Sequence, residues 1–285
     1  MTTDTQAAAG TLPAAAVLPQ VDVWQDIEPL KPTRTLAECI ARDPYPIPFP
    51  HDREGYFGDR HFAYWYSGLY DYLEMAGHLA RHGLTLRAGD GVFDLGCASG
   101  RTLRHFACQH DEPLDLWGSD IKRHNVEWCQ RHLPAPIKVV LGTDYPGLPF
   151  EDRSMSLVYA QSVFTHIDDY ETAWLAELRR ILRPGGMAIL TVHSERLWTR
   201  MNADAPVYNA LLRHKNHPEY PIDPEQFTRP MHSERVVFRM GPALHHVNVF
   251  HSDAYLRRVW GRCLELLEII DEPAKVQAQV VLRKR

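Results

Sequence analysis

From Gly91 onwards the sequence alternates short apolar runs with amphipathic segments, and this alternation limits the fold more than any other feature. The apolar runs, each of strand length, are residues 92–95, 114–118, 137–141, 156–161 and 187–192. The segments TLRHFA, NVEWCQRHL and YETAWLAELRRIL, which lie between runs, place their apolar residues on one side of a helix. Strands that alternate with helices form a parallel sheet covered by helices. The sequence therefore predicts an α/β fold with a doubly wound, mainly parallel sheet.

The end of the chain departs from this alternation. A helix-like segment, SDAYLRRVWGR, is followed by two strand-like runs, CLELLEII and VQAQVVLRKR, and a short connection that includes Asp271, Glu272 and Pro273 separates them. Strands joined by so short a connection can pair only as an antiparallel hairpin. We therefore expect a seven-stranded sheet with an antiparallel C-terminal strand.

Three further segments complete the expected organisation. Residues 1–20 are rich in small residues and lack periodicity, so we expect a flexible tail. Residues 21–83 are expected to form a strap and a helix over the functional site, because prolines at positions 44, 46, 48 and 50 forbid helix and residues 61–83 carry helical periodicity. Residues 84–285 are expected to form the main domain, with a lid-like insertion at about 195–250.

The composition argues against several classes of protein. A formal charge of −5, with no basic cluster before the C-terminal RKR, argues against nucleic-acid binding. No run approaches the roughly 18 apolar residues of a membrane helix, and the alanine-rich N-terminus, interrupted by Gly10 and Pro13, does not resemble a signal peptide. The five cysteines are odd in number and lack CxxC spacing, which favours a reducing, cytoplasmic setting.

A glycine-rich turn follows the first predicted strand, in VFDLGCASGR. A strand that leads through such a turn into a helix presents outward-facing N–H groups to a polar or anionic ligand. Dinucleotide sites carry glycines in the pattern GxGxxG. Here Gly96 and Gly100 are four residues apart, Ala98 takes the middle position and Arg101 stands where the last glycine belongs. The dinucleotide pattern therefore fails.

Two acids at strand ends suit a ligand without a phosphate, and S-adenosylmethionine (SAM) is such a ligand. Asp94 can hold an ammonium group, and Asp120, at the end of the second strand, can accept hydrogen bonds from both ribose hydroxyls. Ile121 can then lie flat against the adenine. Alternatively, Asp94 caps the following turn and Asp120 is the N-cap of the next helix.

The chain at this point resembles the class I SAM-dependent methyltransferases from about residue 60 to its C-terminus. VFDLGCASGR is similar to the first motif of that family, and GTDYPGLPFEDRSMSLVYAQSVFTHI resembles its third-to-fourth-strand region. ELRRILRPGGMAILTVH is similar to the helix, turn and fifth strand, and the family's sheet also ends in an antiparallel strand. The resemblance implies the class I methyltransferase fold, with SAM as the cofactor.

The resemblance also implies further site residues. Asp144 is expected near the adenine amino group and Gln161 on the side of methyl transfer. Two positions depart from the family pattern: Ala98 replaces the middle glycine, which costs little if its φ is negative, and Ser156 replaces an acid. The complete set expected to bind the cofactor is Asp94, Gly96, Cys97, Ser99, Gly100, Asp120, Ile121, Asp144, Gln161 and Tyr66.

Two histidines are the candidates for a general base. His166 and His193 fall at the carboxyl ends of predicted strands, where open α/β sheets place their ligands, and a neutral imidazole can accept a proton from a nucleophile. Either could instead line the site or make a structural hydrogen bond. Among the aromatic residues before Gly83, Tyr66 is the candidate for contact with the sulfonium, while the others are expected to pack. The remaining histidines lack metal-ligand spacing, so no metal is expected.

The expected function is methyl transfer from SAM to a small-molecule acceptor, such as a sugar or a secondary metabolite, by in-line displacement. A non-catalytic SAM-fold binding protein is one alternative, and an NAD(P)-dependent oxidoreductase is another that the glycine spacing opposes. Neither nucleic acid nor a membrane is expected as a partner, and a homo-oligomer remains open.

Overall fold

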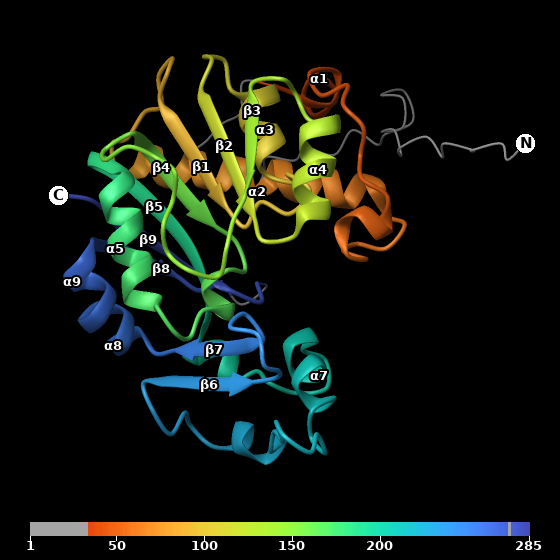
Figure 1. Ribbon diagram of the computed structural model, residues 1–285, viewed down its shortest axis with the longest axis vertical. Coiled ribbons are helices and arrows are strands. Elements are labelled where there is room, and N and C mark those ends of the chain that lie inside the picture. Colours follow the sequence, from red (N-terminus) through yellow and green to blue (C-terminus); the bar gives the residue numbers. More distant parts are fainter. Residues whose placement is uncertain (1–33, 273–274) are drawn as a thin grey trace, which may run out of the picture. The chain divides into compact units, whose positions relative to one another are not determined.

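The computed structural model describes residues 34–272 and 275–285 (Figure 1). Within these ranges the chain divides after Gly142 into two compact units, and each is described by itself. The predicted tail, residues 1–20, and the beginning of the predicted strap, residues 21–33, lie outside the described residues.

Three parallel strands form the sheet of the N-terminal unit, in the order β3, β2, β1. They are β1 (Gly91–Leu95), β2 (Asp115–Asp120) and β3 (Ile137–Leu141), which confirms the three strands predicted for this region. Every residue of β1 is buried, which explains its unbroken apolar character. The register sets Asp94 beside Gly118 and Asp120 beside Leu141, so the two strand-end acids lie on neighbouring strands.

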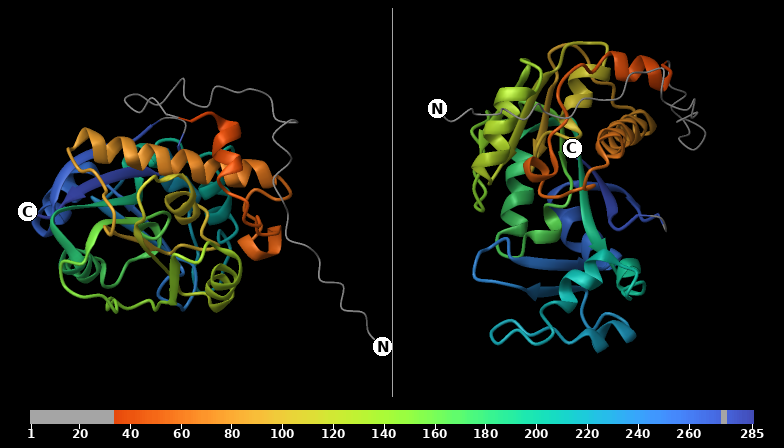
Figure 2. Two further views of the ribbon diagram at one scale, coloured as in Figure 1. Left: turned by 90° about the horizontal axis from the view of Figure 1, so that it is seen from above. Right: turned by 90° about the vertical axis from the view of Figure 1, so that its right-hand side faces the viewer.

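Helices α2 (His61–Arg81), α3 (Leu103–Gln109) and α4 (Arg123–His132) pack in this unit, and their positions match the predicted helical segments. Figure 2 shows the long helix α2, in orange, running beside α3. A Cβ at Gly68 would stand 2.1 Å from the carbonyl oxygen of Arg101, so only glycine lets α2 approach the glycine turn this closely. Tyr64, Trp65 and Tyr72 are buried, which confirms that most of the aromatic residues pack.

The proline-rich strap is fastened to α3 by a buried ion pair. Nη2 and Nε of Arg104 each donate to a carboxylate oxygen of Asp43 at 2.7 Å. The indole Nε1 of Trp65 donates to the same carboxylate, also at 2.7 Å. Arg104 also donates to the carbonyl oxygens of Tyr45 and Pro46. The strap is therefore held by one arginine that satisfies both its acid and its backbone.

The N-terminal unit also holds two short helices that the sequence patterns did not predict. Pro50–Arg53 forms the 3₁₀ helix η2, so the expectation that Pro50 excludes helix was wrong: proline fits the first position of a helix, where no N–H bond is needed. Helix α1 (Leu36–Ala41) begins at Thr35 with a capping box, in which Thr35 and Glu38 bond to each other's backbone N–H groups. That TxxE spacing is a helix-start signal readable from sequence.

The C-terminal unit is built on β4 (Met155–Ala160) and β5 (Leu182–Ser194), which pair in parallel. Strand β9 (Ala278–Arg283) lies antiparallel between β5 and β8 (Glu265–Ile270). The antiparallel hairpin at the end of the chain is thereby confirmed. Helix α5 (Glu171–Ile181) connects β4 to β5 and buries Trp174, Leu175, Leu178 and Ile181.

The segment expected as an insertion contributes two further strands and its own small core. Strands β6 (Arg235–Arg239) and β7 (Val247–His251) pair antiparallel, and β7 continues in parallel with the last two residues of β5 (Figure 1). The segment also contains α6 (Glu195–Trp198), α7 (Pro206–Leu212) and η4 (Pro224–Thr228). Its core includes Leu197, Trp198, Leu211, Phe227, Val236, Phe238 and Phe250.

Short helical segments fill the remaining connections of this unit: η3 (Phe164–His166), α8 (Asp253–Tyr255), η5 (Leu256–Trp260, a π-helix) and α9 (Gly261–Cys263). Among the described helices, none has both the length and the apolar character that a membrane crossing requires.

Candidate functional site

The glycine turn follows β1 and has a left-handed backbone at three positions. Gly96 and Gly100 have φ values of 76° and 71°, and a Cβ at Gly100 would stand 2.4 Å from a methyl group of Leu133. Ala98 has a φ of 46°, so the condition under which alanine would cost little at this position, a negative φ, is not met. A left-handed conformation costs a non-glycine residue about 1–2 kcal/mol, so the turn holds Ala98 in a strained conformation.

The backbone N–H groups of this turn are occupied within the protein. Gly96 and Cys97 both donate to the carbonyl oxygen of Ser119, at 2.8 and 2.9 Å, and Gly100 donates to that of Cys97 at 2.8 Å. Ala98 donates to a carboxylate oxygen of Asp120 at 2.9 Å. The expectation that these N–H groups face outward was therefore wrong for these four, and the turn is instead locked to the end of β2.

The Asp120 carboxylate organises the junction between the turn and α4. Besides Ala98, it accepts hydrogen bonds from the backbone N–H of Lys122 at 2.8 Å and from the side-chain amide of Asn125 at 3.2 Å. The bond from Lys122 matches the alternative in which Asp120 caps the next helix, although Lys122 itself holds the N-cap position of α4. Asp120 is 9% exposed, so its carboxylate lies at the edge of the buried region.

The other predicted residues of this unit surround the same junction. Asp94 is buried at the end of β1. Ile121 is 40% exposed and Leu141, beside Asp120 in the register, is 45% exposed. The ends of β2 and β3 thus each leave an aliphatic side chain exposed close to Asp120.

Ser99, Cys97 and Tyr66 have roles that sequence reasoning did not foresee. Ser99 is buried, and its hydroxyl donates to the carbonyl oxygen of Asp52 in η2, which fastens the strap to the turn. The thiol of Cys97 is buried beside Cys129, and the hydrogen bond with Cys129, together with burial, raises the pKa of Cys97 well above its usual value. Tyr66 is half-buried on α2 and stacks on Phe62, with ring centroids 5.8 Å apart.

The remaining predicted residues belong to the C-terminal unit. Asp144 has a partner within that unit: its carboxylate oxygen lies 2.9 Å from Nδ1 of His245, in the turn between β6 and β7. Gln161 is half-buried and directly follows β4. The carboxylate of Asp144 thus connects the loop after β3 with the β6–β7 hairpin.

His166 and His193 both bond to neighbouring residues of β7. Nδ1 of His166 lies 2.6 Å from the carbonyl oxygen of Val247, so it must carry the proton, and Nε2 then carries the lone pair of the neutral ring. Nε2 of His193 lies 3.2 Å from Oδ1 of Asn248. His193 is 2% exposed, and burial lowers its pKa to about 3. His193 is therefore a weak base in this environment.

Sequence reasoning missed a charged cluster that attaches the β6–β7 hairpin to α5. Glu171, at the first position of α5, accepts hydrogen bonds from Nε2 of His251 at 2.9 Å, Nε of Arg235 at 2.9 Å and Nε1 of Trp260 at 2.7 Å. Arg235 also pairs with Asp168 at 2.8 Å. Burial opposes ionisation of Glu171, but the hydrogen bond and charge of His251, with that of Arg235, lower its pKa to about 2. No local pattern marks these residues, because they are up to 89 positions apart.

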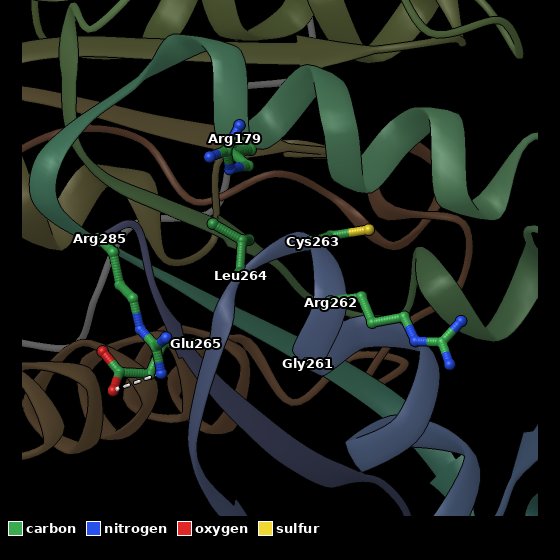
Figure 3. A pocket seen from close by; sticks show the side chains of 7 residues that line it. All are labelled: Arg179, Gly261, Arg262, Cys263, Leu264, Glu265 and Arg285. Carbon is green, nitrogen blue, oxygen red and sulfur yellow. Dashed lines mark hydrogen bonds and ion pairs between the residues drawn. The ribbon is translucent and has the colours of Figure 1, made fainter.

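A cavity of about 220 Å³ lies elsewhere in the C-terminal unit, and Figure 3 shows Arg285 reaching Glu265 at its edge, 3.2 Å away. Its lining residues, none of which is a predicted site residue, are Arg179, Gly261, Arg262, Cys263, Leu264, Glu265 and Arg285. Among the residues that the structure describes, no group of three or more His, Cys, Asp or Glu side chains is arranged to hold a metal ion.

Comparison with known proteins identifies the central part of the chain. Residues 93–190 match the family model described as a methyltransferase domain. An uncharacterized protein from a transposon of Streptomyces fradiae is 36% identical over 137 residues, which are 46% of this chain and 38% of that protein. A fatty-acid O-methyltransferase of Mycolicibacterium smegmatis is 31% identical over 124 residues, 42% of this chain and 44% of that enzyme. The chain thus spans less than half the length of these relatives.

A solved structure shares the fold over most of the chain. The 1,6-didemethyltoxoflavin-N1-methyltransferase of Burkholderia thailandensis has a TM-score of 0.50 and 14% identity, and the alignment covers 82% of this chain and 83% of that one. The strands within each unit, with β9 antiparallel beside β5, fit the same class I fold. Residues 93–190 therefore match a methyltransferase domain, and the fold is that of the class I SAM-dependent methyltransferases.

Proposed function

We propose that this protein transfers a methyl group from SAM to a small-molecule acceptor by in-line displacement: the acceptor atom attacks the methyl carbon from the side opposite the sulfur, and the carbon–sulfur bond breaks. The observation that carries the proposal is the methyltransferase-domain match at residues 93–190, within which Asp120 binds the glycine turn at the tip of β2. The groups at that tip suit an adenosyl ligand: Asp94 and Asp120 can accept hydrogen bonds, and Ile121 and Leu141 offer an apolar surface. SAM is the cofactor of this family, and its sulfonium supplies the activated methyl group.

An oxygen of a small molecule is the acceptor that the relatives favour. The relatives from Mycolicibacterium smegmatis and Aspergillus nomiae are named as a fatty-acid O-methyltransferase and an O-methyltransferase, and the second is 32% identical over 101 residues. The formal charge of −5 also supports a small molecule over a nucleic acid. We therefore propose a hydroxyl or carboxyl group of a secondary metabolite, a sugar or a fatty acid as the methyl acceptor.

His166 is the residue that we propose as the general base. The hydrogen bond from its Nδ1 to the carbonyl oxygen of Val247 favours the tautomer in which Nε2 can accept the proton of a hydroxyl nucleophile. His193 is less suited, because burial lowers its pKa to about 3. Most of the rate enhancement would come from alignment of the acceptor and exclusion of water.

Titration calorimetry with S-adenosylhomocysteine tests the cofactor part of this proposal. We expect Asp94→Ala and Asp120→Ala each to weaken binding by about 1–3 kcal/mol, the scale of a hydrogen bond to a charged group. NADH serves as the competing ligand, and the wild-type protein should not bind it. Unchanged affinity in both variants, or tighter binding of NADH, would contradict the assignment.

The general base is tested by turnover of labelled SAM with a panel of hydroxyl and carboxyl acceptors. Once an acceptor is found, His166→Ala should lower kcat about 100-fold, the low end of general acid–base catalysis, while His193→Ala should have a smaller effect. The matched measurement is the affinity for S-adenosylhomocysteine, which neither variant should alter. Equal rates for wild-type and His166→Ala proteins would exclude His166 as the base.

A further inference from the structure

The strap meets the N-terminal end of α4 through three side chains. Nε2 of His124 lies 3.1 Å from the carboxylate of Asp52, and Nζ of Lys122 pairs with the carboxylate of Glu54. The amide of Asn125 donates to Oε1 of Glu54 at 3.2 Å. All of these contacts lie within the N-terminal unit, immediately after the end of β2.

Asn125 connects two carboxylates. Its Nδ2 lies 3.2 Å from Oε1 of Glu54 and 3.2 Å from Oδ1 of Asp120, and an amide nitrogen carries two hydrogens, so it can donate one to each. Asn125 is 1% exposed, whereas the side chain of Glu54 is 49% exposed. The buried amide therefore holds the exposed acid of the strap beside the acid that ends β2.

The acceptor capacity of Asp120 is nearly used up. An ionised carboxylate offers about four acceptor positions, and Asp120 already receives hydrogen bonds from Ala98, Lys122 and Asn125. At most about one position remains for a ligand. The two hydroxyls of a ribose present two donors. Asp120 in this arrangement has room for only one of them, whereas the sequence predicted that it would accept both.

We propose that Glu54 is a specificity-determining residue for the cofactor: it accepts the hydrogen bond of the ribose hydroxyl that Asp120 cannot take. The inference rests on the proposed function, which sets the adenosyl sugar at the end of β2. Glu54 is the carboxylate that shares Asn125 with Asp120, and its exposed half can face a ligand. The strap thus contributes a recognition group in addition to covering the site.

The backbone and the charges around Glu54 support this role. Glu54 is left-handed, with a φ of 56°, and precedes Gly55 with a φ of 76°, so the chain turns sharply at this point. Burial opposes ionisation of Glu54, but hydrogen bonds from Lys122 and Asn125 lower its pKa. An ionised carboxylate is the stronger acceptor for a hydroxyl donor.

The test compares S-adenosylhomocysteine with its 2′-deoxy and 3′-deoxy analogues in wild-type protein and Glu54→Gln by titration calorimetry. We expect Glu54→Gln to weaken binding of S-adenosylhomocysteine about tenfold, the lower end for a hydrogen bond to a charged group. We also expect one of the two analogues to lose about tenfold in the wild-type protein and little further in the variant. Penalties that do not add in this way show coupling between Glu54 and that hydroxyl, and so identify a contact between them.

Glu127→Gln is the matched control, because Glu127 is an exposed acid of α4, the helix that contains Asn125. This variant should bind all three ligands as the wild type does. If Glu54→Gln fails to fold, Glu54→Asp, which keeps the charge and shortens the side chain, gives the same comparison. Equal penalties for both analogues in variant and wild type would mean that Glu54 only fastens the strap, and would overturn this inference alone. A wild-type protein that binds no S-adenosylhomocysteine overturns the proposed function with it.

Discussion

The two units attach an added segment to their core in different ways. In the N-terminal unit, the strap is anchored by Arg104 and Asp43, whose side chains are both completely buried. In the C-terminal unit, the β6–β7 hairpin is anchored by Arg235, whose side chain is 18% exposed. Arg235 forms ion pairs with both Glu171 and Asp168. The first anchor depends on one pair of opposite charges with no access to water, to which neutral groups add hydrogen bonds. The second contains several charged groups at the edge of the core.

This difference indicates how each segment depends on its charges. A buried ion pair contributes little net stability when intact, but its disruption leaves an uncompensated charge away from water. A network with several donors can redistribute its bonds when one partner changes. We therefore expect the strap to be the more sensitive of the two segments to removal of a single charge.

The largest effect is expected from Asp43→Ala, which leaves Arg104 buried without its carboxylate. The free energy of unfolding, measured by urea denaturation, should fall by about 3–5 kcal/mol. Asp115→Ala is the control, because Asp115 pairs with Lys138 at side-chain exposures of 43% and 51%, and an exposed pair contributes about 0–1 kcal/mol. A loss below 1 kcal/mol for Asp43→Ala would remove the contrast between the two anchors.

A smaller effect, with a defined pH dependence, is expected from Glu171→Gln. The pKa of Glu171 is about 2 in the folded protein against an ordinary value of 4.5, so its ionised form stabilises the folded state above pH 4.5. We expect the variant to lose about 2–3 kcal/mol of unfolding free energy at pH 7.

The difference between Glu171→Gln and wild type should shrink as the pH falls from 4.5 towards 2, because the wild-type carboxylate then takes up a proton on unfolding. Urea denaturation at pH 7 and at pH 3 measures both values. A difference that stays constant over this range would mean that packing, rather than charge, accounts for the role of Glu171.

The smallest effect is expected at the glycine turn, from Ala98→Gly. Relief of the left-handed strain, about 1–2 kcal/mol, is partly offset by the greater chain entropy of glycine when unfolded, so we expect a net gain of about 0.5–1 kcal/mol in unfolding free energy. Ala107→Gly, within α3, should change stability in the opposite direction by a similar amount. A loss of stability in Ala98→Gly would show that its methyl group packs favourably enough to outweigh the strain.

The regular parts of both units were predictable from local patterns. Strands β1 to β5 and the β8–β9 hairpin follow apolar runs whose length and spacing are visible in the sequence. The turn between β1 and α3 is marked by Gly96 and Gly100, and both have the left-handed backbone that glycine allows. Even helix α1, which the patterns at first did not reveal, carries a readable start signal in Thr35 and Glu38.

The particular side-chain contacts of the candidate site were not predictable in this way. Asp120 was expected to face a ligand, yet it accepts three hydrogen bonds from the protein itself. Strands β6 and β7 lie in a segment of mixed composition, and their pairing depends on a core that includes Trp198 and Phe250. In such a segment, packing against neighbouring side chains decides strand formation more strongly than the intrinsic strand propensity of the residues.

The sequence by itself therefore determined the alternation of strands β1 to β5 with helices, the glycine turn and the resemblance to a methyltransferase domain, because each of these depends on neighbours within a few residues. Only the tertiary structure decided that Glu54 meets Asn125, 71 positions later, and that Glu171 meets Trp260, 89 positions later. Contacts of this kind depend on the shape and the buried charge of the folded protein, and neither leaves a periodic mark in the sequence.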